Sequence, residues 1–294
     1  MKSILDYLTP LFIGVSLSCQ LVNGEDFKPN LGPDIQRIEV TCGDVTILLR
    51  QASQWTPGRI DFRGTPMTTE YSAYGTVFSF PGTGFIGTGH LENEPEVLKK
   101  LVFSLDGKPI EMLAATLSGE TFRFERDSQV RAFSLKNIVE LRDNRLYETA
   151  TVTTDEATPQ DQVYHFMHAW VPTVSRFLAG YDDTSEEVIS GELTDAEETA
   201  RIFYIQKPVD WVAVYEPISE QFAVSRLLEA PEGAGNSSNI WNVPPTYRKY
   251  YLKCFQKGTV PAGFNGTWKM VTAFGESNLA EWESKASKLA EQLK

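Results

Sequence analysis

Histidine is scarce in this chain of 294 residues, and its three occurrences mark where acid–base chemistry could take place. His90 stands in the glycine-rich segment Gly84–Glu94, with Glu92 and Glu94 two and four residues after it. In an extended segment these three side chains share one face. An imidazole beside a carboxylate suits general acid–base catalysis, and the trio could also ligate a divalent metal. A solvated loop without a site is the alternative.

The other two histidines, His165 and His168, lie in the segment Val163–Trp170. In a regular strand, a spacing of three residues puts two side chains on opposite faces. We therefore expect one histidine to line a cleft while the other packs in the core. The catalytic candidates are His90, His165, His168 and Glu92, and a packing role remains the alternative for the two mid-chain histidines.

Binding candidates come from arginines and aromatic residues. Arg59 and Arg63 flank Asp61, either as a ladder of ion pairs or with one guanidinium presented to a ligand. Six tryptophans and eleven tyrosines are present, and three of the tryptophans stand near turns. Flat aromatic faces beside polar groups suit sugar rings. The predicted substrate-binding residues are Arg59, Arg63, Glu94, Trp170, Trp241 and Trp268.

Several function classes are disfavoured. Lysine and arginine number 27 against 39 aspartates and glutamates, a formal charge of −12, so nucleic acid and anionic membranes are poor partners. No nucleophile elbow, phosphate loop, dinucleotide-binding motif or cysteine–histidine cluster is present. We expect neither a metal nor a cofactor.

The N-terminus predicts export. Residues 1–24 combine Lys2 with an apolar run, and charge begins at Glu25, as in a secretory signal peptide. Residues 25–294 then form a single mature domain, secreted or periplasmic. A cut before Cys19 would instead lipidate that cysteine and anchor the chain to a membrane. The remaining cysteines, Cys42 and Cys254, either form a disulfide or stay as buried thiols.

The body of the chain reads as β-structure. Short runs of alternating apolar residues are separated by turn residues, with almost no helical periodicity between them. This predicts an all-β fold, a large antiparallel twisted sandwich. The expected strands include Thr121–Glu125, Gln129–Phe133 and Arg145–Thr154. A surface helix follows at the C-terminus, capped by Asn278 with Glu281 in a capping box.

Three segments carry a resemblance to a known family. They are Gly58–Gly64, Gly87–Glu94 and Tyr164–Trp170 with Pro172 after it. Their order over Asp34–Glu276 resembles the galactose-mutarotase-like β-supersandwich family, in its uncharacterised bacterial branches. The resemblance implies a carbohydrate on the concave face of the sandwich and a catalytic histidine, here His165 or His168. The family's late glutamate and its Asn-His-x-Tyr-Phe-Asn motif have no counterpart in this sequence.

The sequence thus predicts an exported carbohydrate-binding protein of mutarotase-like fold. Its catalytic form would be an epimerase or a lyase-type enzyme that uses histidine and glutamate. The alternative is a non-catalytic carbohydrate-binding module or a structural envelope module.

Overall fold

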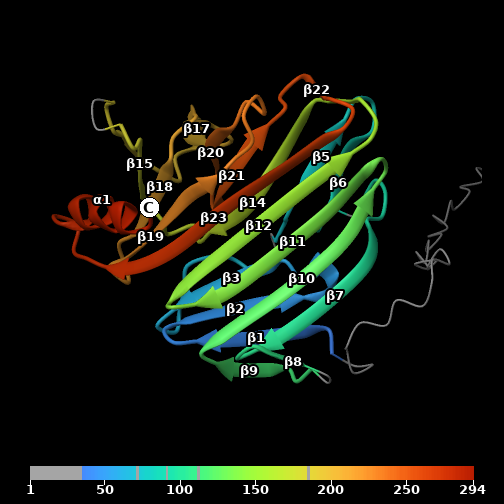
Figure 1. Cartoon of the computed structure of the whole chain (residues 1–294). Coiled ribbons are helices and arrows are strands. Elements are labelled where there is room, and N and C mark those ends of the chain that lie inside the picture. Colours follow the sequence, from blue (N-terminus) through green and yellow to red (C-terminus); the bar gives the residue numbers. More distant parts are fainter. Residues whose placement is uncertain (1–34, 71–72, 91, 111–112, 184–185) are drawn as a thin grey trace, which may run out of the picture.

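The described part of the chain is a sandwich of β-sheets with one α-helix, as the sequence predicts (Figure 1). The structure is a computed structural model that describes residues 35–70, 73–90, 92–110, 113–183 and 186–294. The expected signal peptide, residues 1–24, lies outside these residues, and so does Cys19. Within them, no helix is both long enough and apolar enough to cross a membrane.

One layer is a ten-stranded antiparallel sheet, whose long central strands cross the front of the molecule in Figure 1. Its strands, in spatial order, are β16 (Ile189–Glu192), β15 (Arg176–Gly180), β18 (Trp211–Glu216), β19 (Gln221–Glu229), β23 (Phe264–Glu276), β12 (Arg145–Thr154), β11 (Phe133–Arg142), β10 (Thr121–Val130), β7 (Val97–Leu105) and β8 (Lys108–Pro109).

The other layer consists of two sheets. The five-stranded sheet contains β4 (Thr65–Pro66), β3 (Pro57–Phe62), β2 (Val45–Arg50), β1 (Arg37–Cys42) and β9 (Thr116–Gly119). The six-stranded sheet contains β17 (Phe203–Lys207), β20 (Ser237–Val243), β21 (Tyr247–Cys254), β14 (Gln162–Trp170), β5 (Val77–Phe80) and β6 (Gly84–Gly87). A small sheet and two 3₁₀ turns complete the fold: β13 (Thr158–Gln160), β22 (Gly258–Val260), η1 (Gln51–Ser53) and η2 (Glu197–Thr199).

A single core lies between the layers. Buried and less buried residues alternate along β10, β11 and β12, because successive side chains of a strand point to opposite faces. Phe124 and Leu146 of the ten-stranded sheet belong to the same apolar cluster as Ile47 of the five-stranded sheet and Phe78 of the six-stranded sheet. The ten-stranded sheet therefore packs against both the five-stranded and the six-stranded sheet.

Strand β10 corrects one prediction. The sequence predicts two strands, Thr121–Glu125 and Gln129–Phe133, but the structure has one strand through Val130. The apolar alternation is interrupted because Arg126 takes a buried position, where its guanidinium donates to the carbonyl oxygen of Gln54 at 2.7 Å and to Oδ1 of Asn137 at 2.6 Å. A buried and hydrogen-bonded arginine continues the strand where the pattern indicates a break.

The C-terminal helix α1 (Trp282–Gln292) packs on the outer face of the ten-stranded sheet. Oδ1 of Asn278 accepts hydrogen bonds from the backbone N–H groups of Ala280 and Glu281, but the helix begins only at Trp282, so the predicted start is early. The predicted ion pair between Glu281 and Lys285 is present at 3.1 Å. The buried helix residues are Trp282, Ala286, Ala290 and, just beyond the helix, Leu293.

Strand β14, in the middle of the six-stranded sheet, contains a bulge. Its pairing with β21 shifts register between His165 and His168, and Phe166 has a φ of 55°. A bulge inserts one extra residue and so changes the face that the following side chains take. Both histidines consequently contact the ten-stranded sheet, whereas Tyr164 and Met167 belong to a cluster on the outer face. The prediction that the two histidines lie on opposite faces is wrong for this reason.

Candidate functional site

The outer face of the six-stranded sheet carries a cluster of aromatic residues and two lysines. Along β21, Tyr247, Lys249, Tyr251 and Lys253 alternate on this face, since every second residue of a strand points the same way. Rings from β14, β17, β20 and the segment before β5 surround them. We define the aromatic–lysine face as Tyr74, Tyr164, Phe203, Trp241, Tyr247, Lys249, Tyr251 and Lys253.

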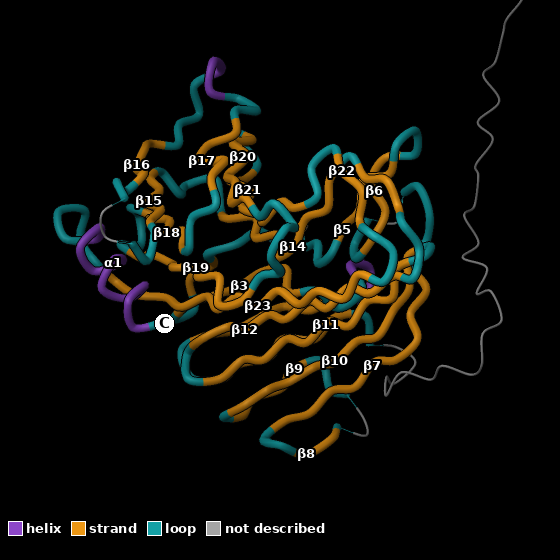
Figure 2. Tube along the Cα trace, turned by 45° about the horizontal axis from the view of Figure 1, so that its top comes forward, coloured by secondary structure: helices purple, strands orange, loops and turns teal. Residues whose placement is uncertain are grey.

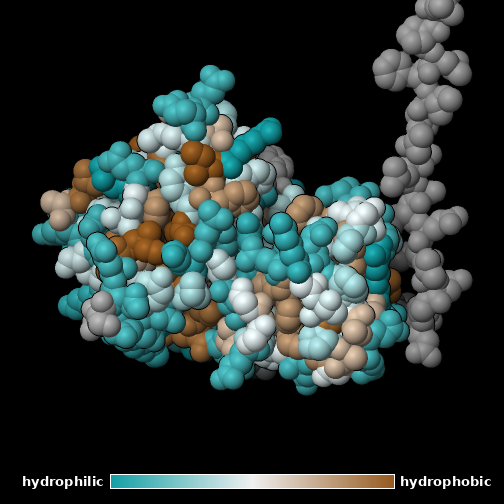
Figure 3. Space-filling model, turned by 90° about the horizontal axis from the view of Figure 1, so that it is seen from above, coloured by the Kyte–Doolittle hydropathy of each residue, from teal (hydrophilic) through white to brown (hydrophobic). Residues whose placement is uncertain are grey.

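The six-stranded sheet curves around this face. In Figure 2, β17 and β20 on one side and β6 on the other rise above β14. Figure 3 looks down on this side of the molecule and shows apolar side chains in separate patches with polar side chains between them. Such a mixed surface suits an amphipathic ligand better than an apolar partner.

The rings are held against one another. Phe203 stacks on Trp241 with 5.7 Å between ring centroids and 8° between planes, and Tyr164 lies 5.0 Å from Tyr251. The indole N–H of Trp241 has no hydrogen-bond acceptor among the described residues. Rings packed in this way offer a flat surface to a sugar, whereas the unpaired indole N–H is itself buried.

The two lysines extend over these rings. The ammonium group of Lys249 lies 4.9 Å from the ring centroid of Tyr74 and 4.7 Å from that of Tyr247, and the ammonium group of Lys253 lies 3.9 Å from that of Phe203. Ammonium groups over ring faces are attracted by the ring quadrupole. Partial burial lowers the pKa of Lys249 to about 8 and also lowers the pKa of Lys253.

The glycine-rich segment places His90 beside this face. A Cβ on Gly87 would lie 2.4 Å from the carbonyl oxygen of Thr76, and a Cβ on Gly89 would lie 2.4 Å from that of Ala73. Both glycines also have a positive φ. This close approach stacks the imidazole of His90 on the ring of Tyr74, with 4.0 Å between centroids. The two glycines therefore allow the close backbone approach that brings His90 to this face.

His90 and Glu92 form a pair, although residues 92–94 are bends rather than the extended segment that the sequence analysis assumes. Nδ1 of His90 donates to Oε1 of Glu92 at 2.5 Å, and Nε2 has no partner among the described residues. Burial lowers the pKa of His90, an effect that outweighs the opposing hydrogen bond and charge of Glu92, and the charge of Lys249 lowers it further. The imidazole is therefore neutral at pH 7, and Nε2 is the nitrogen that can accept a proton.

Glu94 does not join this pair. Its carboxylate is bonded to the guanidinium of Arg131, with 2.9 Å between Arg131 Nε and Glu94 Oε2. The trio expected from the sequence therefore does not converge. In the described part of the chain, no group of three or more His, Cys, Asp or Glu residues could hold a metal ion.

His165 and His168 lie in the core, away from the aromatic–lysine face. His165 is fully buried, with Nδ1 3.0 Å from Oγ1 of Thr76 and Nε2 3.5 Å from Sγ of Cys254. Burial lowers its pKa to about 3, so the ring is neutral. His168 is buried with Nε2 2.8 Å from Oε2 of Glu148. Neither histidine lines a surface that a ligand could reach in this structure.

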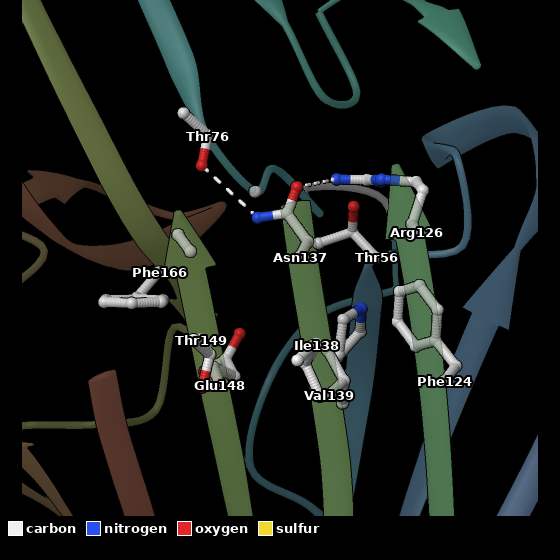
Figure 4. Close-up of a pocket in the computed structure, with 13 residues that line it drawn as sticks. Thr56, Thr76, Phe124, Arg126, Asn137, Ile138, Val139, Glu148, Thr149 and Phe166 are labelled. Atoms are coloured by element: carbon white, nitrogen blue, oxygen red, sulfur yellow. Dashed lines mark hydrogen bonds between the residues drawn. The ribbon is translucent and has the colours of Figure 1, made fainter. Parts of the chain in front are cut away.

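These two histidines adjoin a small cavity between the layers that apolar and polar side chains line together (Figure 4). Thr76, Arg126, Asn137 and Glu148 line it, and Asn137 links Arg126 to Thr76 through its side-chain amide. Arg126 also donates to Thr88 at 2.8 Å. Buried polar groups that satisfy one another in this way fix the geometry of a core.

The other predicted binding residues are divided among three places. Trp241 lies on the aromatic–lysine face, whereas Trp170 and Trp268 are buried in the core. Arg59 pairs with acidic residues on the five-stranded sheet, including Asp61 at 3.0 Å, and Arg63, in the turn after β3, pairs with Asp44 and Glu276. Both arginines therefore form ion pairs within the protein, which is the first of the two roles that the sequence leaves open for them.

Sequence reasoning missed most of the aromatic–lysine face. The signal for it was present in the segment Tyr247–Lys253, where tyrosine and lysine occupy alternate positions of one strand. Tyr74, Tyr164 and Phe203 gave no comparable signal, because only the pairing of distant strands brings them together.

Comparison with known proteins defines the fold. No protein-family model matches this sequence, and no curated protein matches it either. The Slr1438 protein of Synechocystis sp. PCC 6803 matches with a TM-score of 0.55 at 10% identity, over 86% of this chain and 99% of that one. A galactose mutarotase-like protein of Clostridium acetobutylicum matches with a TM-score of 0.52 at 10% identity, over 81% and 95%.

A third match is part of a larger enzyme. The GH36 α-galactosidase AgaB of Geobacillus stearothermophilus has a TM-score of 0.50 at 10% identity, over 85% of this chain but 41% of the enzyme. At these identities the likeness concerns the fold alone. The chain has the galactose mutarotase-like fold that its sequence resemblance implies.

Proposed function

We propose that this protein binds a carbohydrate on the aromatic–lysine face and that His90, oriented by Glu92, acts there as a general base. The observation that carries this proposal is the His90–Glu92 hydrogen bond of 2.5 Å beside the ring of Tyr74. The matching structures from C. acetobutylicum and G. stearothermophilus bear names that refer to galactose chemistry, which supports a sugar ligand.

The pair is built for proton abstraction. Because the carboxylate of Glu92 accepts a hydrogen bond from Nδ1–H of His90, it holds the imidazole in the tautomer whose Nε2 can take a proton. The lowered pKa keeps that nitrogen unprotonated near neutral pH. In an epimerase the proton would come from the anomeric hydroxyl, and in a lyase from a ring carbon next to a carboxylate.

The first experiment identifies the ligand, and the second tests the base. A thermal-shift screen of residues 25–294 against sugars should find a ligand that raises the melting temperature with concentration. With that ligand, H90Q should lower turnover by about 100-fold or more while affinity changes only several-fold. Turnover is followed by anomer interconversion and by ultraviolet-absorbing lyase products.

Matched variants make this test specific. E92Q should lower turnover less than H90Q, and E140Q, which alters a carboxylate paired with Arg123 on the ten-stranded sheet, should leave it unchanged. If H90Q keeps full turnover, the assignment of the base is wrong. If H90Q loses affinity and melting temperature together, His90 is structural.

A second candidate is a carbohydrate-binding module without catalysis. The burial of both mid-chain histidines favours it, because the resemblance assigns the catalytic acid to one of them. In that case a ligand binds, and neither epimerase nor lyase products form with the wild-type protein.

We also propose that the protein is exported, on the basis of residues 1–24. N-terminal sequencing of the mature protein should find a start near Glu25. A start at Met1 contradicts export by cleavage, and a lipidated start at Cys19 identifies an anchored form.

A further inference from the structure

Two lysines of the aromatic–lysine face differ from every other described lysine. Lys249 and Lys253 are each only 8% exposed, whereas the other lysines in the described ranges are exposed. Placing an ammonium group where water is restricted costs free energy unless an opposite charge compensates it. These two positions are therefore unusual places for positive charge.

Neither ammonium group forms an ion pair with an acidic side chain in the part of the chain that the structure describes. The described lysines that form ion pairs are Lys100, Lys269, Lys285 and Lys294, and Lys249 and Lys253 are not among them. Their contacts are ring faces: Tyr74, Trp241 and Tyr247 for Lys249, and Phe203 and Tyr251 for Lys253. The nearby carboxylate of Glu92 is bonded to His90.

We propose that the ligand of this face is an acidic carbohydrate whose anionic groups bind Lys249 and Lys253. This inference rests on the proposed function and names its ligand class. The two lysines are four residues apart on one strand, hence roughly 13 Å between their Cα atoms. The ammonium groups of Lys249 and Lys253 also lie over different rings, so each can bind an acidic group of its own. This arrangement points to an oligosaccharide with at least two acidic units.

The electrostatics agree with this geometry. Removal from water lowers the pKa of both lysines, that of Lys249 to about 8. An anion placed beside an ammonium group acts in the opposite direction, because it favours the charged form. An anionic ligand should thus offset the cost of desolvating the two ammonium groups, which the folded protein bears without a ligand. The aromatic rings should stack on the sugar between the charges.

The test compares acidic oligosaccharides with neutral partners of the same backbone. Trigalacturonate is paired with its methyl ester, and sulfated galactose oligosaccharides are paired with their desulfated forms. Titration calorimetry at pH 7 should show at least one acidic probe bound about tenfold or more tightly than its neutral partner, as expected for a hydrogen bond to a charged group. The tight complex should weaken as salt is added.

Variants assign this preference to the two lysines. The double variant K249Q/K253Q should bind the acidic probe and its neutral partner within about twofold of each other, a difference well under 1 kcal/mol. K249R/K253R, which keeps both charges, should retain the preference. K269Q, on the ten-stranded sheet and paired with Glu229, is the matched control. Circular dichroism and the melting temperature verify that each variant is folded.

Three outcomes overturn the inference. Equal binding of acidic and neutral partners removes it but leaves carbohydrate binding intact. A charge preference that survives K249Q/K253Q in the folded protein shows that the lysines are structural. If no acidic or neutral carbohydrate binds at all, the proposed function fails and this inference fails with it.

Discussion

Individual residues in the core make the stability of this protein depend on pH. The pKa of His165 is lowered by burial from 6.5 to about 3, so the charged ring is disfavoured in the folded state. In the unfolded chain the ring is protonated below about 6.5. The stability that this residue contributes is therefore complete above pH 6.5 and is lost as the pH falls toward 3, at up to about 1.4 kcal/mol per pH unit.

The measurement is denaturant unfolding at pH 7 and at pH 5, where most carboxylates stay ionised. H165Q should be less stable than wild type at pH 7, because it loses the contacts with Thr76 and Cys254, but it should lose less stability between the two pH values. H90Q is the companion variant, since burial also lowers the pKa of His90. An unchanged pH dependence in H165Q would contradict the assignment.

Among single residues, the sequence indicates the contact that is local. His90 and Glu92 are two residues apart and form the expected hydrogen bond. The faces of His165 and His168 depend instead on the bulge at Phe166, which changes the register in the middle of a strand. No periodicity in the sequence indicates that extra residue.

At the scale of elements, the turn after β6, which contains Gly89, positions the proposed base. G89A should destabilise the protein by about 2–4 kcal/mol, because a Cβ there meets the carbonyl oxygen of Ala73 at a φ of 86°. It should also lower turnover or ligand affinity by displacing His90. G82A is the matched control, since Gly82 has a φ of 74° but nothing within 4 Å of its Cβ position.

G82A should cost only about 1 kcal/mol, the strain of a left-handed backbone alone. Denaturant unfolding and ligand titration of both variants provide the comparison. Equal losses in G89A and G82A would show that the close approach to Ala73 has no energetic weight. Full ligand affinity and turnover in a destabilised G89A would separate the segment from the site.

Strand bounds were predictable where the buried positions of a strand hold apolar residues in alternation with polar ones. Strand β12 has the bounds that the sequence indicates, because its buried positions hold mostly apolar residues. The sequence predicts two strands in place of β10 because polar Arg126 and Ser128 occupy buried positions. Asn137 forms a hydrogen bond with Arg126, and Glu96 forms one with Ser128. Polar residues that are satisfied by distant partners leave no trace in local periodicity.

At the scale of the whole molecule, an antiparallel sandwich follows from many short strands and few helical segments. The division of the strands into separate sheets cannot be predicted in the same way. It depends on strand pairing between residues far apart in the chain, such as Leu146 with Thr272 and Val163 with Cys254. The aromatic–lysine face depends on this division, which explains why it emerges only from the folded structure.

The two buried cysteines allow the cooperativity of the fold to be measured directly. Cys42 lies in the five-stranded sheet and Cys254 in the six-stranded sheet, and neither forms a disulfide. Burial raises the pKa of Cys42 to about 11 and raises that of Cys254, so both thiols are protected from alkylation while the sheets are closed. Equal rates of thiol alkylation at Cys42 and Cys254 would mean that the two sheets unfold as one unit. Unequal rates would mean that the five-stranded and six-stranded sheets open separately.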